Sequence, residues 1–422
     1  MERDVGVPLN RVVVTGLGAV SPYGLGLRAL MEGLLSGRSA VVSCAQEWRQ
    51  RIHDIECQVG APLREPIDLN SIPRKFRRGM GPVAAMAVVA AREALEQAGI
   101  SGEVLASGRA GVSFSSTMGS VAATRDFYTK YFQGASIKEY PSGSFFRIMS
   151  HTCAANVAHV FDARGRVLSP NAACASSLVA IGMGFEAIRF GIQDVMLCGG
   201  ADELHAVVSA SFDMLHASSV RYNDRPSQTP RPFDRDRDGV VCGEGAGCLV
   251  LESEASARKR GAAILAEVLG FSTLCAGTHF AQPNAQAVAQ CLRMTLDMSR
   301  LDPDTIDYIN AHATGTVEGD AAEAQGIREV FGESKPPVSS LKGHIGHTLG
   351  ASGALELIAS IRMMRDGFLL PTLNLETPGP GCEGLAFVMR EAVERRVDTI
   401  VKNSFAFGGV NCVLTLQRHC QA

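Results

Sequence analysis

Four short segments of this sequence carry side chains that together could join two thioesters. They are Asn171–Ser177 with its cysteine, Asn310–Thr316 with a histidine, Ser340–His347 with a lysine and two histidines, and Asn403–Gly409 with two phenylalanines. A cysteine thiolate can accept an acyl group and hold it covalently. Two neutral imidazoles with fixed N–H donors can stabilise an enolate oxygen near neutral pH. One such segment alone would be weak evidence for this chemistry.

Cys174 is the candidate nucleophile. It lies between the expected end of a strand and an Ala- and Ser-rich helix. The N-terminus of that helix is expected to lower the pKa of the thiol and so favour the thiolate. The remaining cysteines are expected to be buried and unreactive, because free cysteine is among the residue types most often buried.

No metal site is expected. The sequence has no Cys-x-x-Cys pair, and no carboxylate or cysteine near His344 and His347 completes a ligand set. The run Asp234–Gly239 begins like a calcium loop, but Gly245 stands at the twelfth position, where such a loop needs glutamate.

The order, spacing and chemistry of the four segments resemble the β-ketoacyl-acyl carrier protein synthase family, and within it the elongating type I/II. The resemblance runs from Arg11 to about Leu416. It implies an α/β protein with the thiolase fold, in which two related halves stack in five layers, helix–sheet–helix–sheet–helix. The halves are expected at residues 11–255, with the nucleophile, and 262–416, with the histidines, the lysine and the Phe-rich loop.

The resemblance also implies roles for residues around Cys174. His312 and His347 match the histidine pair that stabilises the enolate. Lys342 matches the lysine that orients the site, and Glu356 matches a glutamate that supports the lysine–histidine network. The implied reaction needs no cofactor of the protein's own, because phosphopantetheine is carried by the acyl carrier protein.

Substrate contacts follow from the same likeness. Thr314 and Thr316 match the pair that hydrogen-bonds the phosphopantetheine arm. Phe407 matches the gate over the nucleophile, and its backbone N–H is expected to form the oxyanion hole with that of the cysteine. Phe405 is expected to pack beside the gate, and Met118 to limit the depth of the acyl chain.

The expected partners are an acyl carrier protein and a second synthase chain. Arg74, Lys75, Arg77 and Arg78 form a dense basic cluster, which matches the place where the family docks its acidic carrier. The family dimerises through its central sheets, so we expect either a homodimer or a heterodimer with a homologue that resembles a chain-length factor.

Bulk properties exclude other classes. A chain of 422 residues exceeds the size at which one core stops growing, so two fused halves are expected. The net charge of −3 indicates neither nucleic acid nor an anionic membrane as a partner. No apolar run is long enough to span a bilayer, and residues 1–4 do not begin a signal peptide. Reduced cysteines in the cytoplasm are the simplest interpretation.

Short β-branched runs alternate with Ala-rich stretches, which predicts an α/β protein with largely buried sheets. The expected strands are residues 11–16, 195–198, 247–251, 306–309, 337–339 and 399–401, and the expected helices are residues 83–98, 176–190, 285–298 and 351–364. The first strand is expected to stop at Gly16. The stretches 175–191 and 351–367 have similar composition and each closes with a glycine, which indicates a weak internal duplication.

Five positions depart from the usual motifs of the family: Ala172, Asn310, Ala313, Ala406 and Val410. Ala406 replaces a glycine beside the gate and is expected to restrict its swing. The departures favour a specialised enzyme for polyketide or polyene chains, including aryl polyenes, as an alternative to saturated fatty-acid elongation.

Three alternatives stay open at this point. A thiolase or an initiating synthase shares the fold, but uses a Cys-His-Cys or Cys-His-Asn set. A non-condensing chain-length subunit lacks the nucleophile, which is present here as Cys174. The chain could also be the active half of a heterodimer with such a subunit.

Overall fold

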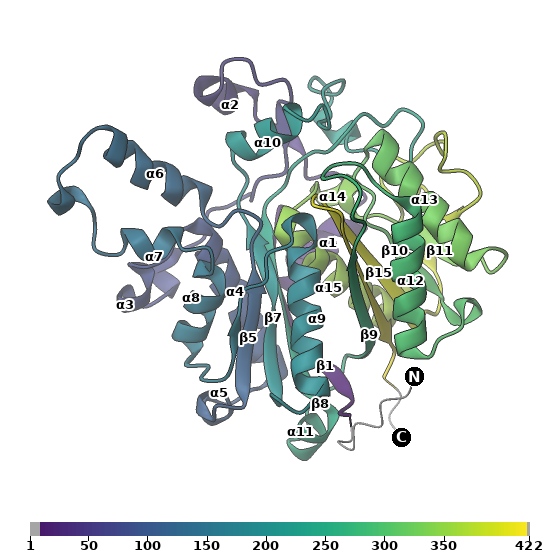
Figure 1. Cartoon of the computed structure of the whole chain (residues 1–422), viewed down its shortest axis with the longest axis horizontal. Helices are drawn as coiled ribbons and strands as arrows, with labels where there is room; N and C mark the ends of the chain where they lie inside the picture. The colour runs from purple at the N-terminus through teal and green to yellow at the C-terminus, as the bar shows by residue number, and fades with distance from the viewer. Residues whose placement is uncertain (1–8, 420–422) are drawn as a thin grey trace.

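A single 12-stranded sheet runs through the described part of the chain, residues 9–419, in the computed structural model (Figure 1). Residues 1–4, which were expected not to begin a signal peptide, lie outside the described residues. The strands of the sheet are β1 (Val12–Ser21), β2 (Gly24–Leu25), β5 (Ala110–Ser115), β6 (Val167–Leu168), β7 (Val195–Asp202), β8 (Gly245–Ser253), β9 (Ala266–Cys275), β10 (Tyr308–Asn310), β11 (Pro337–Ser339), β13 (Ala386–Phe387), β15 (Thr399–Ala406) and β16 (Val410–Gln417). Two short pairs lie apart from it, β3 (Val42–Ser43) with β4 (Val59–Gly60) and β12 (Phe368–Leu369) with β14 (Val393–Glu394).

Helices alternate with these strands and cover them. They are α1 (Gly26–Leu35), α2 (Ala45–Arg51), α3 (Arg74–Arg77), α4 (Pro82–Ala98), α5 (Gly102–Ala106), α6 (Val121–Phe132), α7 (Ser144–Ile148), α8 (Thr152–Phe161), α9 (Ser176–Arg189), α10 (Ala206–Asp213), α11 (Glu254–Lys259), α12 (Ala285–Ser299), α13 (Val317–Phe331), α14 (Lys342–Ile345) and α15 (Ser352–Asp366). No helix within residues 9–419 is long and apolar enough to cross a membrane.

The sheet contains the same strand pattern twice. One group runs β1-β8-β7-β5-β6 and the other runs β9-β16-β15-β10-β11, and β1 pairs with β9 where the groups meet. In both groups the first two pairings are antiparallel and the next two are parallel. The boundaries 11–255 and 262–416 for the two halves stay a prediction.

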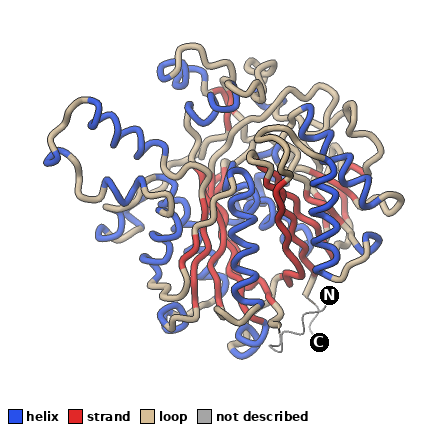
Figure 2. The backbone as a smooth tube through the Cα atoms, viewed as in Figure 1, coloured by secondary structure: helices blue, strands red, loops and turns tan. Residues whose placement is uncertain are grey.

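The layers place α9 and α15 at the centre of the molecule. Both helices contact strands of both groups, and they also contact each other. Helices α4 and α8 cover the outer face of the first group, while α12 covers that of the second and packs against α13 (Figure 2). This is the five-layer thiolase fold that the sequence resemblance implies.

The strand β1 is longer than its sequence predicts. It continues through Gly16 and Gly18 to Ser21, so the expectation of a stop at Gly16 is wrong. A Cβ atom at Gly16 would lie 2.1 Å from the carbonyl oxygen of Ala94, and one at Gly18 would lie 2.0 Å from that of Ala90. These glycines therefore let helix α4 approach the strand closely and do not end it.

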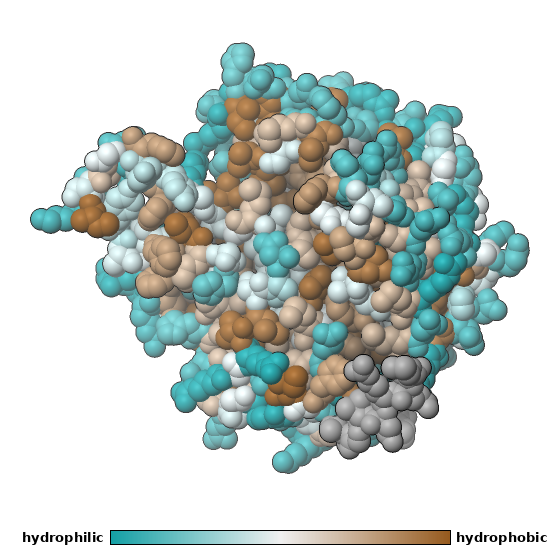
Figure 3. Space-filling model, in the orientation of Figure 1, coloured by the Kyte–Doolittle hydropathy of each residue, from teal (hydrophilic) through white to brown (hydrophobic). Residues whose placement is uncertain are grey.

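A projecting arm, residues 121–148, extends from the body and was not predicted from the sequence. It comprises α6, α7 and the chain between them (Figure 1). Neither helix contains a buried residue. Phe132 is 80% exposed and Ile137 is 82% exposed, and brown hydrophobic surface is visible on the arm in Figure 3. The arm therefore carries apolar side chains that this chain leaves uncovered.

Candidate active site

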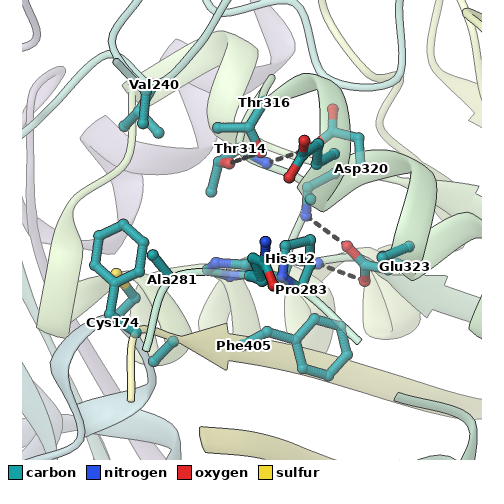
Figure 4. A pocket seen from close by; sticks show the side chains of 18 of the residues that line it. Cys174, Val240, Ala281, Pro283, His312, Thr314, Thr316, Asp320, Glu323 and Phe405 are labelled. Carbon is teal, nitrogen blue, oxygen red and sulfur yellow. Dashed lines mark hydrogen bonds between the residues drawn. The ribbon is translucent and has the colours of Figure 1, made fainter. Parts of the chain in front are cut away.

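A cavity of about 420 Å³ brings together parts of all four sequence segments (Figure 4). Residues predicted for the site that line it are Cys174, His312, Thr314, Thr316, His347, Phe405 and Phe407. They come from both strand groups, so the cavity exists only because the two halves pack together.

Cys174 lies in a tight turn immediately before helix α9. Ala173 has a φ of +45°, a left-handed conformation that is uncommon for a residue with a Cβ. The hydroxyl of Thr117 donates to the carbonyl of Ala173 at 3.2 Å, and that of Ser404 donates to the carbonyl of Cys174 at 3.4 Å. The turn is thus held from two sides with the sulfur facing the cavity.

The acidity of Cys174 differs from the expectation. Burial raises the pKa of the thiol to about 12, and the charge of Lys342 opposes that rise. The thiol is therefore the resting form, and the expected thiolate is wrong for the resting site because desolvation outweighs the neighbouring charge. A proton must leave the sulfur before it can attack.

His312 and His347 form a close pair. Their ring centroids lie 5.3 Å apart with the rings at 84°. Burial lowers the pKa of each imidazole well below its usual value, and the charge of Lys342 lowers it further. Both rings are therefore neutral at neutral pH. Both ring nitrogens of His347 are buried, and neither has a hydrogen-bond partner among the described residues.

Glu323 holds the backbone on which His312 lies. Its carboxylate accepts from the backbone N–H of His312 at 2.9 Å and of Ala313 at 2.7 Å, as the dashed lines in Figure 4 show. The side chain of Asn403 donates to the same carboxylate at 2.9 Å. The imidazole is thereby oriented through its main chain.

Behind the imidazoles lies a buried cluster, the Lys–Glu–Lys triad of Lys342, Glu356 and Lys402. One oxygen of Glu356 accepts from Lys342 at 2.7 Å and the other accepts from Lys402 at 2.6 Å. The three side chains are at most 1% exposed. Lys342 and Glu356 were predicted for this network, and the two ammonium groups lower the pKa of the carboxyl against the opposing effect of burial.

Thr314 and Thr316 lie on the wall of the cavity. Their hydroxyls are 3.2 Å apart. Asp320 accepts from the backbone N–H of Thr314 at 3.0 Å and of Gly315 at 3.2 Å, which fixes the loop. The pair lines the same cavity as Cys174, and its contact with the phosphopantetheine arm stays a prediction.

The predicted gate is the tip of the β15–β16 hairpin. Phe407 lines the cavity and its ring centroid lies 5.8 Å from that of Phe212, while Phe405 meets the ring of His312 at 6.0 Å. Gly408 and Gly409 have φ of +86° and +73°, which the turn requires. The oxyanion role of the Phe407 N–H stays a prediction.

Two predicted elements do not line this cavity. Met118 is 51% exposed and is not among the residues that line it. The cluster of Arg74, Lys75, Arg77 and Arg78 lies on and beside helix α3, which contacts α8 on the side of the body that bears the arm (Figure 1). Met118 nevertheless directly follows Thr117, whose hydroxyl donates to the carbonyl of Ala173 beside the nucleophile, so its backbone lies close to the Cys174 turn.

Several residues of the site were missed in the sequence. Lys402 is one, although a lysine directly after the apolar run Ile400–Val401 was a signal that could have revealed it. Glu323 and Asp320 are others, and each is a fully buried carboxylate on α13 that follows the His312 segment. Both lie close to the motif in sequence, but Asp and Glu are almost never fully buried unless paired, so carboxylates on a helix are first read as exposed.

The described residues contain no group of three His, Cys, Asp or Glu side chains that could hold a metal ion. The carboxylates of the calcium-like run instead bind the protein itself. Asp234 accepts from the side chain of Arg231 and from the backbone N–H of Glu376, and Asp238 accepts from the backbone N–H of Arg221. These contacts fix the conformation of the loop, so the carboxylates have a structural role.

Comparison with known proteins agrees with the geometry. The N-terminal domain of Beta-ketoacyl synthase matches residues 9–257, and its C-terminal domain matches residues 265–376. The chain is 35% identical to 3-oxoacyl-[acyl-carrier-protein] synthase 2 of Coxiella burnetii, over 97% of this chain and 99% of that one. It is also 35% identical to the tetracenomycin polyketide synthase ketoacyl synthase alpha subunit of Streptomyces glaucescens, over 97% of both chains.

A crystal structure of a beta-ketoacyl synthase from Burkholderia phymatum is 42% identical and superimposes with a TM-score of 0.93, over 98% of this chain and all of the other. The two family domains, the fold and the arrangement of the cavity all agree with the same family. The chain therefore belongs to the β-ketoacyl synthase family of condensing enzymes.

Proposed function

We propose that the protein is a 3-oxoacyl-[acyl-carrier-protein] synthase that lengthens an acyl chain by decarboxylative Claisen condensation. The observation that carries the proposal is a single cavity in which a cysteine faces two neutral imidazoles, with a buried ammonium behind them. The reaction needs no cofactor of its own, since the phosphopantetheine belongs to the carrier.

The first half-reaction moves the acyl group to Cys174. The thiol loses its proton, and its sulfur attacks the acyl thioester of the first carrier. The carrier thiol leaves with a proton, and the acyl group stays on the enzyme. The ammonium of Lys342 stabilises the thiolate while it forms, and the N–H groups of Cys174 and Phe407 stabilise the oxyanion.

The second half-reaction makes the carbon–carbon bond. Malonyl carrier protein loses CO₂, and the electron pair of the broken bond forms an enolate. His312 and His347 donate hydrogen bonds to its oxygen, while Thr314 and Thr316 hold the pantetheine arm. The α-carbon then attacks the acyl carbonyl, the Cys174 thiolate leaves, and a 3-oxoacyl carrier is released.

The test is acyl transfer in the Cys174→Ala variant. With acyl and malonyl carriers, the natural protein is expected to gain an acyl mass on Cys174 and to release 3-oxoacyl carrier, and the variant is expected to do neither. Cys412→Ala is the matched control, because Cys412 is buried on β16 and does not line the cavity. Condensation by the Cys174→Ala variant would contradict the proposed role of Cys174 as the nucleophile.

A thiolase mechanism has less support. It would need a second cysteine or an asparagine beside the nucleophile and histidine. Cys412 pairs with Ser404 across the β15–β16 ladder and packs in the apolar core. Preference for malonyl carrier over acetyl-CoA is the expected distinction.

A second candidate is the active subunit of a polyketide synthase pair, for polyketide or polyene chains. The chain is 35% identical both to a 3-oxoacyl-[acyl-carrier-protein] synthase 2 and to a polyketide synthase alpha subunit, and this equal identity supports the second candidate beside the first. The departures at Asn310, Ala406 and Val410 support it as well. Mass spectrometry of acyl groups trapped on Cys174 from saturated and conjugated carriers distinguishes the two, because only the specialised enzyme is expected to accept conjugated chains.

The partners follow from the surface. The uncovered aromatic arm supports a dimer, with a second copy or with a chain-length-factor-like homologue. Arg74, Lys75, Arg77 and Arg78, on and beside α3, are the proposed docking surface for an acidic carrier. The free cysteines of the described chain support a cytoplasmic location.

A further inference from the structure

Lys402 gives the site a second buried ammonium that the proposed reaction does not yet use. Its Nζ donates to Glu356 at 2.6 Å and to the backbone carbonyl of Asn403 at 2.7 Å, and its side chain is 0% exposed. Lys342 occupies the other oxygen of the same carboxylate. The carboxylate of Glu356 thus accepts hydrogen bonds from two lysines, one on each oxygen.

The charge of the triad is unbalanced. With all three groups ionised, the buried triad alone carries two positive charges and one negative charge, and Glu323 is a further carboxylate whose charge acts on Lys402. A buried charge that lacks a full counterion is costly, so it requires compensation from its surroundings. The groups that gain from a positive field are the ones next to it, namely a thiol that must ionise and an enolate that carries negative charge.

Lys402 also lies where two supporting networks meet. The next residue, Asn403, donates to Glu323, which holds the backbone of His312. Two adjacent residues of β15 therefore bind two of the buried carboxylates of the site, Glu356 behind the lysine and Glu323 behind the histidine. Strand β15 continues from there to Phe405 and the gate.

We propose that Lys402 is a positioning residue for the condensation: by binding the second oxygen of Glu356, it fixes that carboxylate and places a second positive charge near the two imidazoles. The inference rests on the proposed function. Its consequence is that Lys402 supports the decarboxylation step through His312 and His347, and that it touches neither substrate nor the reacting atoms.

The charged groups around the imidazoles set the expected pH response. His312 faces Lys342 from α14, Lys402 from β15 and the ring of His347, while Glu323 on α13 binds its backbone. His347 faces Lys342 and Lys402. Each positive charge disfavours imidazolium. Removal of one charge therefore raises the pKa of both imidazoles, and the neutral donors are lost at a higher pH.

The experiment measures decarboxylation of malonyl carrier protein, without an acyl donor, from about pH 5 to about pH 9. Lys402→Met removes the charge but leaves Lys342 and Glu356 as a balanced pair. Lys402→Gln also removes the charge and keeps a donor for Glu356, so it replaces the Met variant if that one does not fold. Lys259→Met, at an exposed lysine, is the matched control.

The Lys402 variants are expected to keep the KM for malonyl carrier, to lose about tenfold in kcat, and to show an acid limb about one pH unit higher. Lys259→Met is expected to match the natural protein. Unchanged kcat and an unchanged acid limb in a folded Lys402 variant overturn the inference, as does a fall in kcat that is equal at every pH. Failure of the natural protein to decarboxylate malonyl carrier or to condense it counts instead against the proposed function.

Discussion

At the scale of single residues, the central quantity is the acidity of Cys174. Burial raises its pKa to about 12, and Lys342 is the neighbour that lowers it. A positive charge stabilises the thiolate, so removal of that charge moves the pKa up and reduces the thiolate fraction at neutral pH. The nucleophile is therefore a thiol in the resting site, and the positive charge of Lys342 favours loss of its proton.

We predict that Lys342→Met slows alkylation of Cys174 by iodoacetamide at neutral pH, by about tenfold for each unit by which the pKa rises. The variant keeps Glu356 paired with Lys402, so no buried carboxylate is left alone. The rate is followed by mass spectrometry against pH. An unchanged rate in a folded variant would mean that Lys342 does not control the thiol.

The sequence predicted most of the residues assigned to catalysis, but it did not predict most of the residues that hold them in place. Cys174, His312, Lys342 and His347 lie in compact motifs whose residue types indicate their roles. Lys402 instead sits one position beyond an apparent strand end, and only the pairing of β15 with β10 and β16 shows that the strand continues. A long-range contact such as Lys402 to Glu356 leaves no local pattern in a single sequence.

At the scale of elements, the Lys–Glu–Lys triad joins α14, α15 and β15. Glu356→Gln would leave two buried ammonium groups without a carboxylate. We predict a loss of about 3–5 kcal/mol in the free energy of unfolding, measured by urea denaturation. Glu32→Gln is the control, because Glu32 forms an exposed ion pair with Arg28, and a change below about 1 kcal/mol is expected there.

The pH dependence of this contribution has a definite sign. The folded state holds the pKa of Glu356 below its ordinary value, so its ionised form favours folding. That contribution is present above the unfolded pKa and is lost as the pH falls through the folded pKa. The difference in unfolding free energy between the natural protein and Glu356→Gln should therefore shrink under acid conditions. A difference that grows toward low pH would contradict the assigned charge state.

The gate is an element whose behaviour depends on one departure from the family pattern. Ala406 is the last residue of β15, pairs with Val410, and has no positive φ, so the hairpin does not require glycine there. We predict that Ala406→Gly lowers the free energy of unfolding by roughly 0.5–1 kcal/mol and increases hydrogen exchange at the hairpin tip. Faster acylation of Cys174 in that variant would identify the gate as a limit on the first step. Equal exchange in both proteins would refute the expected restriction of its swing.

The duplication seen faintly in the sequence is clear at this scale. Helices α9 and α15 each follow a short turn that begins at a non-glycine residue with positive φ, Ala173 at +45° and Leu349 at +53°. The first of these turns presents the nucleophile. Similar helix composition gave the hint, but the repeated strand order depends on pairings between distant segments, which periodicity does not reveal.

At the scale of the whole molecule, the arm is the feature that a single chain does not explain. A 12-residue helix such as α6 is marginal by itself in water, and no residue within it is buried. Its aromatic side chains contact one another, as Tyr131 and Phe132 do at 5.3 Å, and remain exposed. Such a surface is expected to be covered by another chain.

We predict that a variant with Tyr131, Phe132 and Ile137 all changed to serine loses its dimeric state, because a dimer formed through the central sheets is expected to need the added burial of these apolar side chains. Light scattering after gel filtration should give twice the 44.7 kDa chain mass for the natural protein and the single-chain mass for the variant. The control changes the exposed Val42 and Leu35 to serine, away from the arm, and should stay dimeric. A natural protein that is monomeric alone but dimerises with a cysteine-less homologue would assign the arm to a heterodimer, whereas a variant that stays dimeric would show that the interface lies elsewhere.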